Sequence, residues 1–254
     1  MEILEAKNLT KIYGGKRGVN STYALNGIDI SIVQGDFVGI MGPSGSGKTT
    51  LLNILSGIDK PTSGQVRIHS KDIVGLSKND MAIFRRKNLG LIFQDYNLIE
   101  GFTLAENIQL PLLLQKIPIE EINIRVQQLM KIFNIYEIKN KYPYYVSGGQ
   151  QQRTAACRAL VTNPAVLLAD EPTGNLDSKA SRKFMKYLEL INVDRSATIL
   201  MATHDSFAAS FCKRITFIKD GRIYSEIQRK EGQREFFDRI LDSLAVLGGE
   251  VNEF

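Results

Sequence analysis

The sequence lacks several features that would assign it to particular protein classes. Among its 254 residues, no apolar run approaches the roughly 18 residues that span a bilayer, so we do not expect this chain to cross a membrane by itself. Residues 1–6 contain neither a basic segment nor a small-residue cleavage site, and we expect the chain to stay in the cytosol. Internal repeats and low-complexity tracts are also missing. The composition is that of an ordinary globular protein, with 43% hydrophobic and 23% charged residues.

Cysteine and long basic runs are scarce as well. Cys157 lies in a helical pattern and Cys212 in a strand-like pattern, and neither has the paired spacing of a zinc site or a redox motif. We interpret both as small buried residues in a reducing compartment. The net charge of +5 suits either the inner face of an anionic membrane or weak binding of nucleic acid. Composition therefore leaves the function open.

The most informative stretch is the glycine-rich segment 42–50, which follows the apolar run 37–41. Its three glycines remove side chains, so that backbone N–H groups can face phosphate oxygens, while Lys48 reaches the β- and γ-phosphates and Thr49 can ligate Mg²⁺. Residues 50–57 have helical spacing, which places the positive end of a helix dipole under the phosphates. A chance match to this pattern arises in roughly one in a hundred unrelated chains. Chance rarely supplies the strand and the helix too, so we predict a phosphate loop. The residues expected to line it are Gly42, Pro43, Ser44, Gly45, Ser46, Gly47, Lys48, Thr49 and Thr50.

Two alternating segments, 3–12 and 23–32, predict strands on either side of a glycine-containing loop, 14–22, which we expect to be mobile. Tyr13 stands just before this loop. It can be an aromatic packed between strands, or a platform on which adenine stacks. The motifs in the rest of the chain favour the second interpretation.

Polar side chains follow three apolar, strand-like runs. Gln94 ends the first, where its amide can cap a turn with Asp95, ligate Mg²⁺ or orient water. Asp170 and Glu171 end the second, and such a pair can divide the work of holding Mg²⁺ and polarising an attacking water. His204 ends the third. It can be a functional residue of the site, or simply a solvated histidine in a loop. Because ligand groups gather at the carboxyl ends of parallel strands, we expect these residues to converge beside the phosphate loop.

Helical signals dominate the middle of the chain. Residues 103–106 form a capping box, 119–133 carry apolar residues at helical intervals, and Ser147 with two glycines begins a helix that runs to about Leu160. We therefore predict an inserted helical lobe and a second anion-binding helix start.

The remaining segments give simpler signals. Residues 65–69 predict a half-exposed strand with His69 on the surface, and Ser178 is expected to cap a helix that follows Asp177. An Asp-Gly turn predicts the hairpin 214–227. A final helix, about 233–247, carries one apolar face and stops at two glycines. The residues expected on that face are Phe237, Ile240, Leu241, Leu244 and Leu247, and we expect them to pack mainly on the same domain.

Together these motifs resemble the nucleotide-binding subunit of an ABC transporter over essentially the whole chain. The matching segments are 42–49 (Walker A), Gln94 (Q-loop), 147–150 (signature), 166–171 (Walker B and catalytic acid), 174–177 (D-loop), His204 (switch histidine) and Tyr13 (A-loop). Val146 replaces the leucine that usually opens the signature, an apolar change that we expect to leave phosphate binding intact.

The resemblance implies an α/β P-loop NTPase cassette with a mainly parallel core sheet, an N-terminal antiparallel β lobe and an inserted α-helical lobe. It implies one ABC ATPase domain, 1–254, with its α/β core in 1–94 and 163–230, the helical lobe in 95–162, and a C-terminal helix and tail in 231–254. Two copies would face head to tail and hold ATP and Mg²⁺ between them. The implied catalytic residues are Glu171, His204 and Gln94, the implied metal ligands are Thr49, Gln94 and Asp170, and the implied signature contacts to ATP are Ser147, Gly148, Gly149 and Gln150.

Within the family, residues 93–99, 170–177 and 246–254 look like the ATPases of bacitracin-efflux-type systems, which are related to the macrolide and lipoprotein-release group. That subgroup implies a large membrane permease, a location at the cytoplasmic face of the cell membrane, resistance to cell-envelope peptide antibiotics and often a sensor histidine kinase. A lipoprotein-release or macrolide-type ATPase is one alternative. A soluble ABC ATPase acting on nucleic acid or ribosomes is another, but no long coiled coil and no second cassette are present, so no nucleic acid is expected. Glu171 and His204 disfavour a non-enzymatic cassette.

Overall fold

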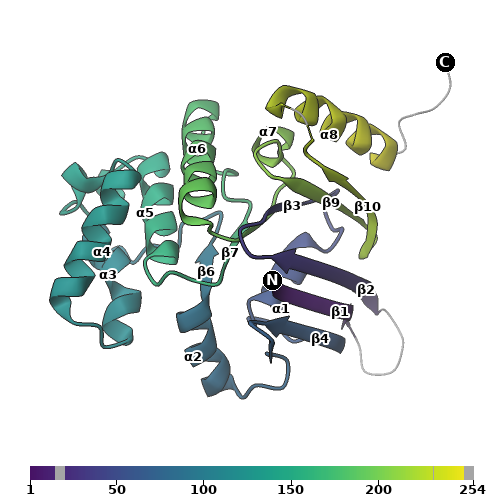
Figure 1. Ribbon diagram of the computed structural model, residues 1–254, viewed down its shortest axis with the longest axis horizontal. Helices are drawn as coiled ribbons and strands as arrows, with labels where there is room; N and C mark the ends of the chain where they lie inside the picture. The colour runs from purple at the N-terminus through teal and green to yellow at the C-terminus, as the bar shows by residue number, and fades with distance from the viewer. Residues whose placement is uncertain (15–20, 231, 249–254) are drawn as a thin grey trace.

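The structure is a computed structural model that describes residues 1–14, 21–230 and 232–248. Most of the loop that we expected to be mobile, residues 15–20, lies outside the described residues. Four strands make an antiparallel sheet in the order β2-β1-β4-β5, of which β2, β1 and β4 are labelled in Figure 1. They are β1 (Glu2–Tyr13), β2 (Thr22–Val33), β4 (Ser63–Ile68) and β5 (Lys71–Asp72). The predicted N-terminal antiparallel sheet is confirmed.

Six further strands make the central sheet, in the order β10-β9-β3-β8-β7-β6. They are β3 (Phe37–Met41), β6 (Leu89–Ile92), β7 (Val166–Asp170), β8 (Ile199–Ala202), β9 (Arg214–Lys219) and β10 (Arg222–Gln228). Neighbouring strands from β9 to β6 run parallel, and only β10 pairs antiparallel, in the hairpin predicted from the Asp-Gly turn. The prediction of a mainly parallel core sheet is therefore confirmed.

Helices flank both sheets, and α3, α4 and α5 pack together at one side of the molecule (Figure 1). The helices are α1 (Lys48–Leu55), α2 (Lys78–Asn88), α3 (Leu104–Leu114), α4 (Ile119–Ile132), α5 (Gly148–Leu160), α6 (Ser178–Arg195), α7 (Ser206–Ala209) and α8 (Gln233–Gly248), with short 3₁₀ turns η1 (Tyr136–Ile138) and η2 (Pro143–Tyr145). None of the helices in the described ranges is long and apolar enough to span a bilayer. The helical part matches expectation, and its boundaries at 95 and 162 stay a prediction.

The central sheet separates two hydrophobic clusters, because successive strand residues point to opposite faces. Phe37 and Met41 of β3 pack in the cluster under the helices, whereas Val38 and Ile40 pack in the cluster shared with α1 and the antiparallel sheet. All five residues of β3 are buried. The strand that leads into the phosphate loop is thus held on both faces.

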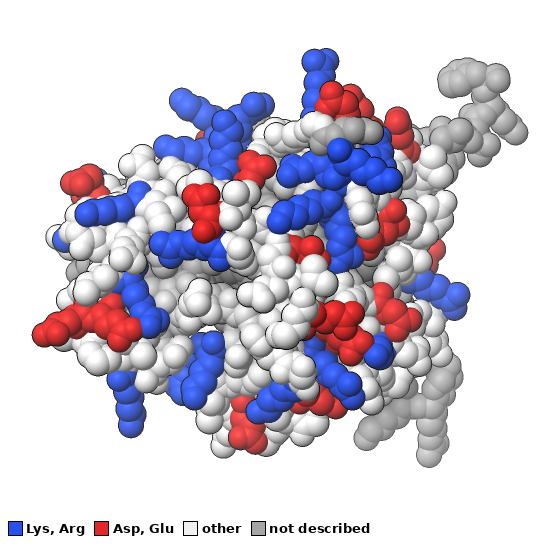
Figure 2. All heavy atoms as spheres, in the orientation of Figure 1, with Lys and Arg blue, Asp and Glu red and all other residues white. Residues whose placement is uncertain are grey.

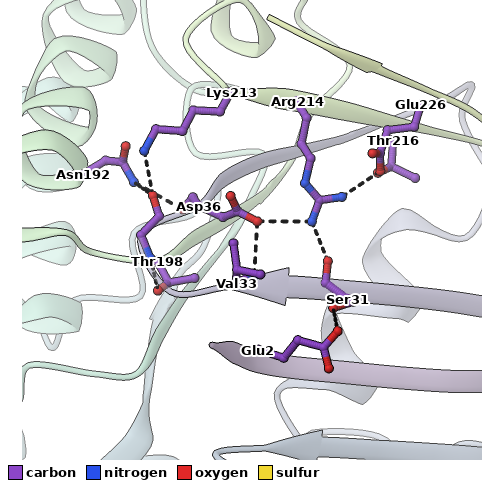
Figure 3. A network of polar contacts seen from close by, with 11 residues as sticks. Glu2, Ser31, Val33, Asp36, Asn192, Thr198, Lys213, Arg214, Thr216 and Glu226 are labelled. Atoms are coloured by element: carbon purple, nitrogen blue, oxygen red, sulfur yellow. Dashed lines mark hydrogen bonds and ion pairs between the residues drawn. The ribbon is translucent and has the colours of Figure 1, made fainter.

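A polar network fixes the start of that strand (Figure 3). The Arg214 guanidinium donates to Glu226 Oε2 at 2.7 Å, to Asp36 Oδ2 at 3.3 Å and to the Ser31 carbonyl. Asn192 Nδ2 and Lys213 Nζ both donate to the Gly35 carbonyl, at 2.9 and 2.7 Å. The turn between β2 and β3 is therefore tied to β9, β10 and α6, which joins the two sheets.

Charged side chains of both signs cover the face seen in Figure 2, with Lys and Arg gathered over the upper end of α6. The first half of α6 supplies exposed basic residues at positions 179, 182, 183 and 186. On this face, Asp and Glu side chains interrupt the basic groups. Basic and acidic groups are therefore mixed on the face that this view presents.

Several local predictions were wrong. Asp177, not Ser178, caps α6, because its carboxylate accepts the Ala180 N–H at 2.8 Å and complements the positive helix end. His69 lies beyond β4 with a left-handed φ of 49°, in the turn toward β5, although it is exposed as expected. Cys212 lies in a bend before β9 rather than in a strand. Both Cys157 and Cys212 are buried and free, as expected.

The final helix forms as predicted, but its buried face differs. Phe236, Ile240 and Leu247 are buried in the main cluster, whereas Phe237 is half-buried and Leu241 is 43% exposed. Neighbouring residues on a helix differ by about 100° in direction, so Phe236 takes the place expected for Phe237. The helix reaches Gly248, and Gly249 lies outside the described residues.

Candidate active site

The phosphate loop joins β3 to α1 and is shaped by close backbone contacts. A Cβ at Gly42 would collide with the Ile218 carbonyl oxygen, and one at Gly47 would collide with the Ala24 carbonyl oxygen. Gly47 also has a φ of 106°, which L side chains rarely adopt. The N-cap of α1 is this glycine, and no side chain caps the helix. The first N–H groups of α1 therefore have no partner within the helix and can donate to an anion.

Two side chains of the loop also indicate a phosphate ligand. Ser46 is 3% exposed, and its Oγ has no hydrogen-bond partner in the described part of the chain. Lys48 Nζ donates to the carbonyls of Gly42 and Pro43, at 2.8 and 3.0 Å, within its own loop. Burial lowers the pKa of Lys48, and the carboxylates of Glu171 and Asp170 oppose this shift. An orphaned hydroxyl, an uncapped helix and a lysine at one loop fit the triphosphate of ATP.

Thr49 and Asp170 bring two oxygen ligands together beside this loop. Thr49 Oγ1 donates to Asp170 Oδ1 at 3.3 Å. Burial raises the pKa of Asp170, while the hydrogen bond from Thr49 and the charge of Lys48 oppose the shift. Within residues 1–14, 21–230 and 232–248, no three His, Cys, Asp or Glu side chains gather as a metal site. The pair fits Mg²⁺, which binds one or two protein groups together with substrate phosphates and water.

Glu171 and His204 meet at the ends of the neighbouring strands β7 and β8. His204 Nδ1 lies 2.9 Å from Glu171 Oε1, and the His204 backbone N–H donates to Oε2 at 3.4 Å. The two residues line a cleft of about 420 Å³ that also contacts Gly174, Arg182 and Phe207. Glu171 is 17% exposed and His204 72% exposed. The cleft thus holds a positioned carboxylate that water can reach.

Gln94 lies two residues beyond β6 and pairs with Asn175, a residue that sequence reasoning missed. Gln94 Nε2 donates to Asn175 Oδ1 at 3.1 Å, and Asn175 Nδ2 donates to the Gln94 carbonyl at 3.2 Å and to Asp95 Oδ1 at 2.9 Å. Asn175 belongs to the turn after Glu171. The signal was an amide inside segment 174–177, which the resemblance matched to the D-loop. Gln94 is therefore linked to the turn after Glu171, and within the described ranges no hydrogen bond joins it to the phosphate loop.

Ser147 caps α5 as predicted. Its Oγ accepts the Gln150 N–H at 3.4 Å, and Gln150 Oε1 accepts the Ser147 N–H at 2.9 Å. A small hollow beside Ser147 and Gly149 is lined by Arg153, Lys179 and Lys183, among others. In the part of the chain that the structure describes, no hydrogen bond joins residues 147–150 to the phosphate loop. The start of α5, which we predicted to bind an anion, thus shares no hydrogen bond with the start of α1.

Tyr13 ends β1 and is 43% exposed, so it is not packed away between strands. Its hydroxyl donates to Asp59 Oδ2 at 2.7 Å, and Lys11 Nζ lies 4.8 Å from its ring centroid. Burial, together with the hydrogen bond to Asp59, raises the pKa of Tyr13. An exposed ring held at its hydroxyl is compatible with the predicted adenine platform.

Comparisons with known proteins agree with this geometry. Residues 25–174 match the family described as ABC transporter. The chain is 51% identical over 254 residues to an uncharacterized ABC transporter ATP-binding protein, YvcR, of Bacillus subtilis, with 100% of this chain and 98% of the relative covered. It is 48% identical over 254 residues to the bacitracin export ATP-binding protein BceA of Halalkalibacterium halodurans, with 100% of both chains covered.

A solved structure shares the fold. The ATP-binding cassette MJ0796 of Methanocaldococcus jannaschii, in a dimeric post-hydrolysis state bound to ADP and Pi, matches with a TM-score of 0.82. The match is 40% identical in sequence and covers 91% of this chain and 100% of the other. Since the family match covers more than half of the chain and full-length relatives share about half of its residues, the chain belongs to the ABC transporter ATP-binding proteins and is an ATPase subunit that binds ATP.

Proposed function

We propose that two copies of this chain face head to tail and hold two ATP molecules, each between the phosphate loop of one copy and residues 147–150 of the other. One observation carries this proposal: the helix starts at Lys48 and at Ser147, which we predicted to bind anions, share no hydrogen bond within the described chain. A nucleotide bound at one of them leaves the other unused, and a second copy would supply it. The dimeric form of the MJ0796 cassette supports the same arrangement.

Within each site, we assign the phosphates to residues 42–50 and the ion to Thr49, Asp170 and Gln94. A bound Mg²⁺ would neutralise developing charge on the phosphates. Glu171 would accept a proton from the attacking water, and His204 holds its carboxylate in place through the 2.9 Å contact. From the second copy, Ser147, Gly148, Gly149 and Gln150 would donate to the outer phosphate.

ATP would then bind the closed dimer more tightly than the open one, which is the condition for a ligand to drive a conformational change. Hydrolysis and phosphate release would reopen it. We propose that an integral permease at the cytoplasmic face of the cell membrane converts this closure into transport. The chain would lie on that face through its contact with the permease.

For the cargo, we propose peptide antibiotics that target the cell envelope, with a sensor histidine kinase acting through the same permease. Support comes from the full-length similarity to a bacitracin export ATP-binding protein. The cargo would be met by the permease, so its recognition would leave no chemistry in this chain.

Genetic complementation tests this cargo. The gene is deleted in its own organism, and the strain receives either the unchanged chain or Glu171→Gln. We expect the deletion to sensitise cells to bacitracin-type peptides and only the unchanged chain to restore growth. Sensitivity confined to macrolides, or equal rescue by Glu171→Gln, would contradict the proposal.

A pull-down from detergent-solubilised membranes tests the partner. The tagged chain should retain one integral membrane protein, identified by mass spectrometry. Retention of ribosomes or nucleic acid in place of a membrane protein would overturn the assignment to a permease.

A further inference from the structure

We propose that Asp59 is a positioning residue for nucleotide binding, which together with Lys11 holds the Tyr13 ring so that its free face receives the adenine base. This inference rests on the proposed nucleotide site and goes beyond it, because Asp59 belongs to none of the motifs. Asp59 and Tyr13 are 46 residues apart and meet through the fold.

The contacts use both oxygens of the carboxylate. The Tyr13 hydroxyl donates to Asp59 Oδ2 at 2.7 Å, and Lys11 Nζ donates to Oδ1 at 2.7 Å. Lys11 Nζ also donates to the Lys60 carbonyl at 2.7 Å, and the Lys60 N–H donates back to Asp59 Oδ1 at 2.7 Å. Hydrogen bonds to a charged carboxylate are stronger than neutral ones, so this cluster restrains the phenol ring.

The cluster also gives the two faces of the ring different surroundings. The Lys11 and Tyr13 side chains both contact Asp59, so they lie on the same side of β1. The Lys11 ammonium lies 4.8 Å from the ring centroid, and the Lys11 side chain is only 13% exposed. One ring face is therefore occupied by a fixed cation, while 43% of Tyr13 remains exposed for a flat ligand.

Asp59 is tied to the phosphate loop through α1. The helix carries Lys48 and Thr49 in its first turn and ends at Leu55. Just beyond it, the backbone N–H groups of Ile58 and Asp59 both donate to the Asn53 carbonyl, at 2.9 and 3.1 Å. A single rigid helix thus fixes both the phosphate ligands and the carboxylate that orients the base platform.

Protonation states agree with these roles. Burial would raise the pKa of Asp59, but hydrogen bonds from Lys11, Tyr13 and the Lys60 backbone outweigh it, and the pKa is lowered. Burial and the contact with Asp59 raise the pKa of Tyr13. The phenol therefore stays a donor and the carboxylate an acceptor at neutral pH.

The test compares ATP with tripolyphosphate, which has the phosphates but no base, by titration calorimetry in the presence of Mg²⁺. Asp59→Asn and Tyr13→Phe should each raise the Kd for ATP about 3- to 10-fold, because Tyr13→Phe removes the hydrogen bond to Asp59, and Asp59→Asn weakens both that bond and the ion pair with Lys11. Neither should change the Kd for tripolyphosphate. The effects of the two changes should add to less than their sum in the double variant, since both act on the bond between Tyr13 and Asp59. Lys7→Ala, which removes an ion pair with Glu5 on the same strand, is the matched control and should bind ATP normally.

Three results would overturn the proposal. If Tyr13→Ala weakens ATP binding while Asp59→Asn and Tyr13→Phe do not, Tyr13 is the platform but Asp59 does not position it. If Asp59→Asn weakens ATP and tripolyphosphate equally, Asp59 acts on the phosphate loop or on folding instead. A Tyr13→Ala variant with unchanged ATP affinity would refute the base contact itself, which is a failure of the proposed site rather than of Asp59 alone.

Discussion

His204 and Glu171 form a two-point contact, in which the imidazole Nδ1 lies 2.9 Å from one carboxylate oxygen and the His204 backbone N–H donates to the other at 3.4 Å. Glu171 has a left-handed φ of 45°, and its N–H donates to the Ala202 carbonyl at 2.9 Å. Such a conformation costs about 1–3 kcal/mol in a residue with a side chain and persists only when its surroundings hold it. The pairing of β7 with β8 holds Glu171 in this conformation and directs its carboxylate into the cleft.

Lys48→Ala should weaken ATP binding itself. The ammonium can form charge-assisted hydrogen bonds to phosphate, each worth about 1.5–3 kcal/mol, so we expect the Kd for ATP to rise about 10- to 100-fold. Equilibrium binding of a fluorescent ATP analogue measures this. An unchanged Kd would remove Lys48 from the phosphate site.

Asn175→Ala should impair turnover more than binding, because it frees the Gln94 side chain from the turn that follows Glu171. Losing hydrogen bonds worth about 0.5–1.5 kcal/mol each should lower kcat about 3- to 10-fold at a nearly constant KM. Asn123→Ala is the control, since among the described residues the Asn123 side chain accepts a single hydrogen bond, from Gln109 on the surface. Equal kcat values for the two variants would show that the Gln94 contact is unimportant.

Phe236→Ala should test whether α8 packs on its own domain. Phe236 is fully buried, and truncation of such a side chain costs about 3–5 kcal/mol of unfolding free energy. Leu241→Ala on the same helix is the control, because Leu241 is 43% exposed, and it should cost less than about 1 kcal/mol. Urea unfolding of both variants decides the matter. Similar midpoints would contradict the packing role.

Much of the active-site edge of the central sheet could be predicted, because the local sequence pattern there indicates where each strand ends. Buried runs that end in polar residues placed Asp170, Glu171 and His204 at strand ends, and the parallel order of β7 and β8 then brings them together. The hairpin followed equally from its Asp-Gly turn. Each of these signals lies within a few residues of the structural feature that it predicts.

Other features depend on contacts that no local pattern encodes. The bond from Tyr13 to Asp59 and the bond from Gln94 to Asn175 join segments 46 and 81 residues apart. Whether Phe236 or Phe237 is buried depends on the rotation of α8 about its axis, which is set by how the helix packs on the main hydrophobic cluster. Asp177 and Ser178 both favour an N-cap by propensity, and only the backbone shows that the helix begins after Asp177.

Both cysteines should resist thiol reagents in the folded chain. Cys157 and Cys212 are 0% exposed, and burial raises the pKa of each thiol, so little reactive thiolate forms at neutral pH. Labelling with Ellman's reagent should be slow in buffer and should release two equivalents in guanidinium chloride. Rapid native labelling would mean that the cluster around these residues opens readily.

The most direct test of the account is the behaviour of Glu171→Gln with ATP and Mg²⁺. The amide keeps nearly the shape of the carboxylate but cannot accept the proton of the attacking water. Size-exclusion chromatography with light scattering should detect an ATP-dependent dimer, while a phosphate-release assay on the same sample detects no turnover. Hydrolysis near the unchanged chain's rate, or a variant that stays monomeric at saturating ATP, would contradict the assignment of Glu171 and the shared nucleotide site.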